Sequence, residues 1–156
     1  MYKKIMVPLD GSSLAECVLP HVETLAKAEG VERVIFVRVA EPFSLTPVRG
    51  EQAWFSDEEE KNIDARSRAN AQNYLDQLVG QLNYGPVSIQ KEVLFGKSAP
   101  SLAEYANKNN IDLVVLATHG RSGVSRWVMG SVADRLLRSV NAPVLMVRAP
   151  GCAPAK

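Results

Sequence analysis

The chain has 156 residues, of which 46% are hydrophobic and 22% are charged, and its formal net charge is +1. This mix fits one globular domain with a sizeable core, and the charge alone implies no polyanion partner such as nucleic acid. Two cysteines without metal-ligand spacing suit a reducing cytoplasm, and no apolar run is long enough for a signal peptide or a membrane span. We expect a cytoplasmic protein with one domain over residues 1–149 and a short tail over residues 150–156.

The first element should be a strand followed by a tight turn and a helix. Residues 4–9 form a short apolar run that predicts the first and central strand, and residues 10–13 form a turn. Ser13 and Glu16 have the spacing of a capping box, so the helix should begin there and end at about residue 29. Pro20 would lie inside this helix and kink it.

The middle of the chain predicts two more strands and two more helices. Residues 34–39 form a second β-rich run, and residues 41–52 read as a loop. Four acidic residues at 57–60 favour the start of a long polar helix that continues to about residue 82. Apolar and polar residues alternate over 87–95, which indicates a less buried strand at a sheet edge. A shorter helix should follow over residues 100–109.

A strand, a small-residue loop and a helix start follow one another between residues 112 and 132. The apolar run at 113–117 predicts a strand buried on both faces. After the glycine-containing loop at 118–123, Gly130 and Ser131 precede a helical pattern. Glycines permit close backbone approach, and a helix N-terminus offers free N–H groups and partial positive charge, so this arrangement predicts an anion site, most often for phosphate. Alternatively, the glycines only turn the chain and Ser131 only caps the helix.

Alternation of strands and helices predicts an α/β fold with an open, parallel, five-stranded sheet and helices on both faces. Such sheets bind ligands beyond the C-terminal ends of the strands, where the strand order reverses. If the order is 3-2-1-4-5, Asp10 and residues 117–123 flank the same crevice. Asp10 could hold a ribose hydroxyl or a metal, or it could cap the next turn, and these alternatives stay open.

Several nucleotide and hydrolase motifs are absent from the sequence. There is no Gly-x-x-x-x-Gly-Lys-Ser/Thr stretch, no dinucleotide fingerprint in the turn at 10–13, and no Gly-x-Ser-x-Gly elbow. Near the loop, Asp10 and His119 are the available general bases. The sequence therefore gives little support to an enzyme that turns over a nucleotide rapidly.

Three parts of the sequence together resemble the universal stress protein family. The sequence motif of that family is a glycine, any two residues, a second glycine, any nine residues, and then Gly-Ser or Gly-Thr. This chain has Ala117, Gly120, Gly130 and Ser131 at that spacing, with alanine in place of the first glycine. Residues 5–12 look like the family's first strand and turn, and its last strand is similar to residues 142–148. The resemblance implies a Rossmann-like fold of the adenine nucleotide alpha hydrolase-like type.

The ATP-binding branch of the family implies a set of nucleotide-binding positions. They are Pro8, Asp10, Val39, Leu116, Ala117, Gly120, Arg121, Gly130, Ser131 and Val132. Asp10 would lie near the ribose, and Val39 would meet the adenine through its backbone. The positions from Gly120 onward would hold the phosphates, where Arg121 and Arg126 either add charge or face solvent. Mg2+ would accompany ATP and be held mostly by phosphates and water. Alanine at 117 costs little in extended backbone but is strained at positive φ.

Three functions follow from these observations. The chain could be an ATP-binding stress-response regulator with slow hydrolysis at best, a dimeric interaction module of the same family that binds no nucleotide, or an enzyme acting on a nucleotide. The last strand would be an apolar sheet edge, which invites pairing with another chain, and the resemblance also implies dimers through it. We expect a homodimer with an interface that includes Val144, Leu145, Met146 and Val147.

Overall fold

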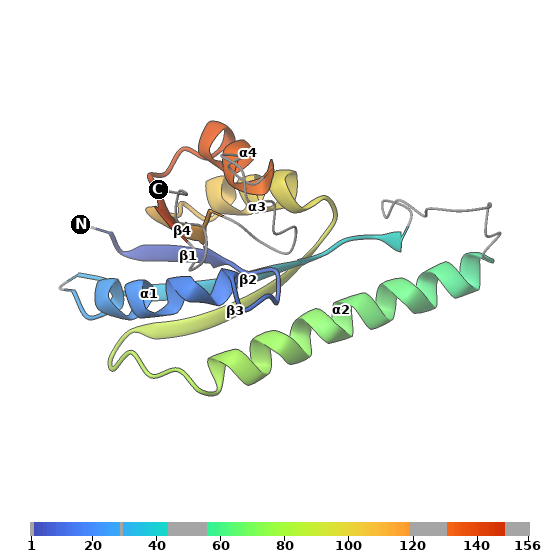
Figure 1. Ribbon diagram of the computed structural model, residues 1–156, viewed down its shortest axis with the longest axis horizontal. Coiled ribbons are helices and arrows are strands. Elements are labelled where there is room, and N and C mark those ends of the chain that lie inside the picture. The colour runs from blue at the N-terminus through green and yellow to red at the C-terminus, as the bar shows by residue number, and fades with distance from the viewer. Residues whose placement is uncertain (1, 29, 44–55, 119–130, 149–156) are drawn as a thin grey trace, which may run out of the picture.

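A computed structural model describes residues 2–28, 30–43, 56–118 and 131–148. It contains a five-stranded sheet in the order β3-β2-β1-β4-β5, in which every neighbouring pair is parallel (Figure 1). The strands are β1 (Lys4–Pro8), β2 (Arg33–Ala40), β3 (Ser88–Phe95), β4 (Leu113–Ala117) and β5 (Val144–Val147). The predicted strand order is confirmed, and so is the position of β3 at an edge.

Helices cover both faces of this sheet, as predicted (Figure 1). They are the 3-10 helix η1 (Ala15–Val18), α1 (Leu19–Ala26), α2 (Asp57–Val79), α3 (Ser98–Lys108) and α4 (Ser131–Ser139). On one face, Ile5 and Phe36 pack in a cluster with Val22 of α1 and Leu75 of α2. On the other face, Met6 of β1 packs in a second cluster, which includes residues of α3 and α4. Alternate residues of each central strand therefore enter opposite halves of the core.

The first helix begins differently from the prediction. Ser13 is exposed and caps nothing in the described structure, whereas the Ser12 hydroxyl accepts a hydrogen bond from the Ala15 N–H at 3.1 Å. Asp10 holds Ser12 in this position, because Asp10 Oδ1 accepts hydrogen bonds from both the Ser12 N–H and the Ser12 hydroxyl. Pro20 lies in the first turn of α1, where its missing N–H costs nothing, so the predicted kink is replaced by a change from 3-10 to α-helix. The helix then ends at Ala26, before the expected boundary.

Helix α2 is anchored at its C-terminal half. Ser56 forms a capping box with Glu59, and the 23 residues that follow span roughly 34 Å at 1.5 Å per residue. Figure 1 shows the start of this helix running past the C-terminal end of β2. Its buried side chains, Ala71 and Leu75, both come from the second half. That half is the part of α2 that packs on the sheet.

Candidate functional site

The C-terminal edge of the sheet brings three predicted site residues together. Pro8 pairs with Val37, and continuing this register places Asp10 level with Val39 of β2. The register between β1 and β4 likewise places Asp10 level with the residue that follows Ala117. Neighbouring strands lie roughly 4.8 Å apart. Asp10, which follows β1, therefore lies level with Val39 of β2 and with the residue after Ala117 of β4, at the point where the strand order reverses and where α/β sheets bind their ligands.

Asp10 organises the turn that leaves β1. Its Oδ1 accepts hydrogen bonds from the Ser12 N–H at 2.9 Å and from the Ser12 hydroxyl at 2.6 Å. Gly11 between them has a φ of +83°, a conformation that glycine adopts without strain. A carboxylate can accept about four hydrogen bonds, so holding Ser12 and holding a ribose hydroxyl are compatible roles. Of the alternatives left open by the sequence, the structure shows the turn-capping role directly.

The other predicted residues on the strands surround the same edge. Pro8 and Val39 are half-buried at the ends of β1 and β2, and Leu116 is buried in β4. Ala117 is the last residue of β4, and among the described residues Asn110 is the one non-glycine with positive φ. Alanine in place of the motif glycine is therefore unstrained here, which answers the question raised by the sequence.

Part of the predicted phosphate site lies outside the described residues. This applies to Gly120, Arg121 and Gly130 among the predicted nucleotide-binding positions, and also to His119 and Arg126. Ser131 is the first residue of α4, as predicted, and the half-buried Val132 follows it and packs against the core cluster that also contains Leu116. The structure thus places the start of α4 on the face of the sheet to which Leu116 points.

A cluster of polar side chains beside Asp10 was not predicted from the sequence. The guanidinium carbon of Arg38 lies 4.7 Å from the centre of the Tyr74 ring. The Tyr74 hydroxyl donates a hydrogen bond to Glu16 Oε1 at 2.8 Å. Burial raises the pKa of Tyr74 well above its usual range, and the Glu16 hydrogen bond and charge raise it further. The one available signal was Arg38 itself, which interrupts the apolar residues that follow Arg33 in β2.

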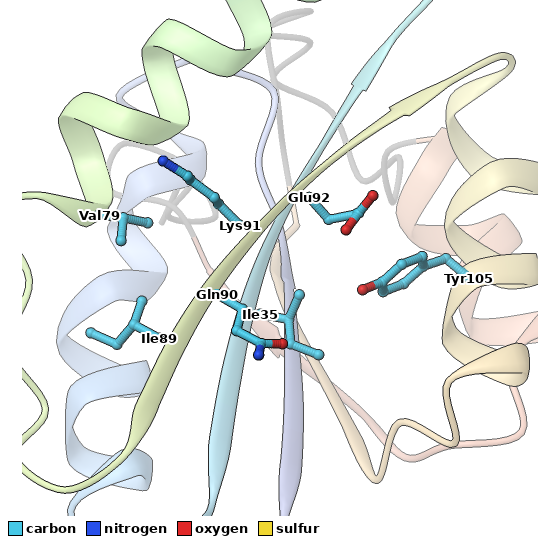
Figure 2. A pocket seen from close by; sticks show the side chains of 7 residues that line it. All are labelled: Ile35, Val79, Ile89, Gln90, Lys91, Glu92 and Tyr105. Carbon is cyan, nitrogen blue, oxygen red and sulfur yellow. The ribbon is translucent and has the colours of Figure 1, made fainter.

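A cavity of about 390 Å³ lies beside β3, away from these residues. Figure 2 shows Ile89 and Lys91 on one side of the strand, and Glu92 and Tyr105 on the other. Burial raises the pKa of Tyr105, and the negative charge of Glu92 raises it further. The lining side chains do not converge on one point, and none of them is a predicted site residue. The edge at Asp10 remains the better candidate.

In the part of the chain that the structure describes, no group of three or more His, Cys, Asp and Glu side chains could hold a metal ion. No described helix is long and apolar enough to cross a bilayer. The arrangement at Asp10 offers hydrogen-bond acceptors and a positive charge, which suits the binding of a polar ligand.

Comparison with known proteins agrees with this geometry. The sequence profile of the Universal stress protein family matches residues 1–148. Universal stress protein MJ0531 of Methanocaldococcus jannaschii is 32% identical, over 96% of this chain and 84% of its own.

Solved structures share the fold over nearly the whole chain. The structure of protein MJ0577 has a TM-score of 0.82 at 24% identity, over 97% of this chain and 99% of that one. A universal stress protein family protein from Arabidopsis thaliana, solved with AMP bound, has a TM-score of 0.63 at 14% identity, over 96% of this chain and 93% of that one. With the sheet order, the matched profile and the similar relative in agreement, the chain belongs to the universal stress protein family.

Proposed function

We propose that this chain binds ATP in the crevice between β1 and β4, and that it acts in the cytoplasm as a stress-response regulator through nucleotide-dependent binding. The observation that carries the proposal is the placement of Asp10 level with Val39 and with the residue after Ala117 at the sheet edge. An Asp beside a strand end suits a ribose, and the backbone of Val39 near the end of β2 suits an adenine edge. The family relative with bound AMP supports an adenine nucleotide as the ligand class.

The phosphates belong at the start of α4 in this proposal. Gly120 and Gly130 stand at the motif spacing, Arg121 follows Gly120 and could add charge, and Ser131 and Val132 open the helix. Backbone N–H groups at a helix start attract anions, and a serine hydroxyl adds one further donor. Mg2+ would be held by the phosphates and water, with little help from protein carboxylates. Hydrolysis should be slow, and turnover on the order of 1 per second, which is near the low end of typical enzyme rates, would overturn this part of the proposal.

Mass spectrometry of the purified protein, followed by calorimetric titration, tests the proposal. The protein should carry or bind an adenine nucleotide, and ATP should bind more tightly than AMP because it has more phosphates. Ser131→Ala should lose about one charge-assisted hydrogen bond, which weakens ATP binding roughly 10- to 100-fold. If the variant binds ATP as tightly as wild type and merely melts earlier, Ser131 is a helix cap and has no phosphate role.

A dimeric interaction module without nucleotide is the second candidate. The exposed edge strand β5 favours it, because Leu145 is 39% exposed and Leu137 of the neighbouring α4 is 44% exposed. We propose a homodimer through Val144, Leu145, Met146 and Val147, with or without nucleotide. Light scattering at micromolar concentration should give the mass of a dimer. A dimer that neither carries nor binds any nucleotide would favour the second candidate over the first.

A further inference from the structure

We propose that Arg38 is a positioning residue for the sugar end of the site: it fixes the turn that carries Asp10 and makes the site select ribonucleotides over deoxyribonucleotides. The inference rests on the proposed binding of ATP and adds a specificity to it. Arg38 acts through the backbone of Gly11, which follows Asp10 directly.

The side chain of Arg38 lies between the sheet and α2. Val34 and Phe36 alternate with it along β2, and both enter the core cluster shared with α1 and α2, so Arg38 points to the same face. There its guanidinium stacks on Tyr74 at 4.7 Å. On the turn side it lies so close to Gly11 that a Cβ added to this glycine would be 3.0 Å from Cζ and from both Nη atoms. The guanidinium is thus confined between an aromatic ring and the backbone of the turn.

The stack is itself held in place. The Tyr74 hydroxyl donates to Glu16, which lies in η1, a few residues after the turn. Four elements therefore meet at one point: the β1 turn, η1, β2 and α2. An arginine suits this position better than a lysine, because a flat guanidinium can stack on a ring and present several donors at its rim. Loss of the arginine would leave the positive-φ turn without the group that now packs against it.

The consequence for binding follows from the position of Asp10. Its carboxylate is oriented by Ser12, which lies on the far side of Gly11. A displacement of the turn by about 1 Å is enough to spoil a hydrogen bond to a ligand. Arg38 should therefore influence the recognition of ribose hydroxyls, whereas the phosphate end at α4 should not depend on it.

A cycle of variants and nucleotides tests this inference. ATP, 2′-deoxy-ATP and 3′-deoxy-ATP are titrated into wild type, Arg38→Gln and Arg68→Gln. Wild type should bind ATP roughly tenfold or more tightly than at least one deoxy analogue, which is the range expected for a hydrogen bond to a charged group. In Arg38→Gln the affinity for ATP divided by the affinity for that analogue should fall to near one, because the variant binds ATP more weakly and the analogue as before. Arg68 is the matched control, because its guanidinium also stacks on a ring, 3.6 Å from the centre of Phe95, and removing it changes the charge equally.

The outcomes separate this inference from the proposed function. If wild type discriminates and Arg38→Gln weakens ATP and the analogues by the same factor, or changes nothing, the positioning role is wrong while ATP binding stands. If wild type binds no ATP, the proposed function fails and this inference fails with it. Amide NMR of the protein without nucleotide gives an independent readout. Arg38→Gln should shift the Gly11 and Ser12 resonances and Arg68→Gln should not; unchanged resonances in a folded Arg38→Gln protein would overturn the positioning role.

Discussion

Substitution of Gly11 by alanine should destabilise the protein through two separable effects. The residue has a φ of +83°, where a Cβ costs about 1–2 kcal/mol. The same Cβ would stand 3.0 Å from the Arg38 guanidinium, which would have to shift on the Tyr74 ring. The stacking that this shift weakens is worth roughly 0.5–2 kcal/mol. Gly11→Ala should therefore lower the free energy of unfolding by about 1.5–4 kcal/mol.

Gly85 provides the matched control for this prediction. It also has positive φ, at +66°, but an added Cβ would meet nothing within 4 Å. Gly85→Ala should cost about 1–2 kcal/mol, the strain alone. An alanine also stabilises the protein by lowering the conformational entropy of the unfolded chain. This stabilisation is the same in both variants, so it cancels in the comparison. Urea unfolding, with the slope m checked for constancy, measures the free energy of unfolding for each.

A double-mutant cycle then isolates the contact with the guanidinium. In an Arg38→Ala background, Gly11→Ala should cost no more than Gly85→Ala does, because the side chain that it would displace is gone. If Gly11→Ala costs the same with and without Arg38, the reasoning about their contact is refuted. Equal losses for Gly11→Ala and Gly85→Ala in the wild-type background would refute it as well.

Three further predictions concern other parts of the molecule. Ser56→Ala should lower the stability by about 1 kcal/mol in thermal melts, because Ser56 Oγ accepts from the Glu59 N–H and the Glu59 carboxylate accepts from the Ser56 N–H. Burial raises the pKa of Tyr84 to about 12, so the wild type should lose stability as the pH rises from about 10 to about 12, when the unfolded phenol ionises first. Tyr84→Phe should lose less over that interval, and a parallel decline of both proteins in urea titrations would contradict this. Leu145→Lys should convert the expected homodimer to a monomer in light scattering, because it puts a charge on the apolar edge; a dimer that persists would place the interface elsewhere.

The sheet was predictable because its signals are local. Four strands are apolar runs and β3 alternates apolar and polar residues, the handedness rule restricts the crossovers, and the order 3-2-1-4-5 brings Asp10, Val39 and Ala117 to one edge of the sheet. The start of the first helix was not predictable in the same way. Ser12 and Ser13 both suit a cap, and the choice depends on the Asp10 carboxylate, which holds Ser12.

The cluster around Arg38 could not be predicted from the sequence, for a different reason. Arg38 and Tyr74 are far apart in the chain, and no periodicity relates a strand residue to a particular turn of a later helix. Their contact depends on where α2 crosses the sheet, which is set by the burial of Leu75. A polar residue inside an apolar strand marks a position that needs a partner, but it does not say which partner.

The central position of β1 has a consequence for synthesis on the ribosome. Ile5 and Met6 pair with β4, whose first residue, Leu113, is made 105 residues after Pro8. At roughly 5–20 residues per second, one side of the first strand waits about 5–20 s for its neighbour. Pairing with β2 protects the opposite side much sooner, because Arg33 follows closely in the chain. Throughout that interval the nascent sheet ends at an apolar, unpaired β1, which makes it a target for chaperones and a hazard for aggregation.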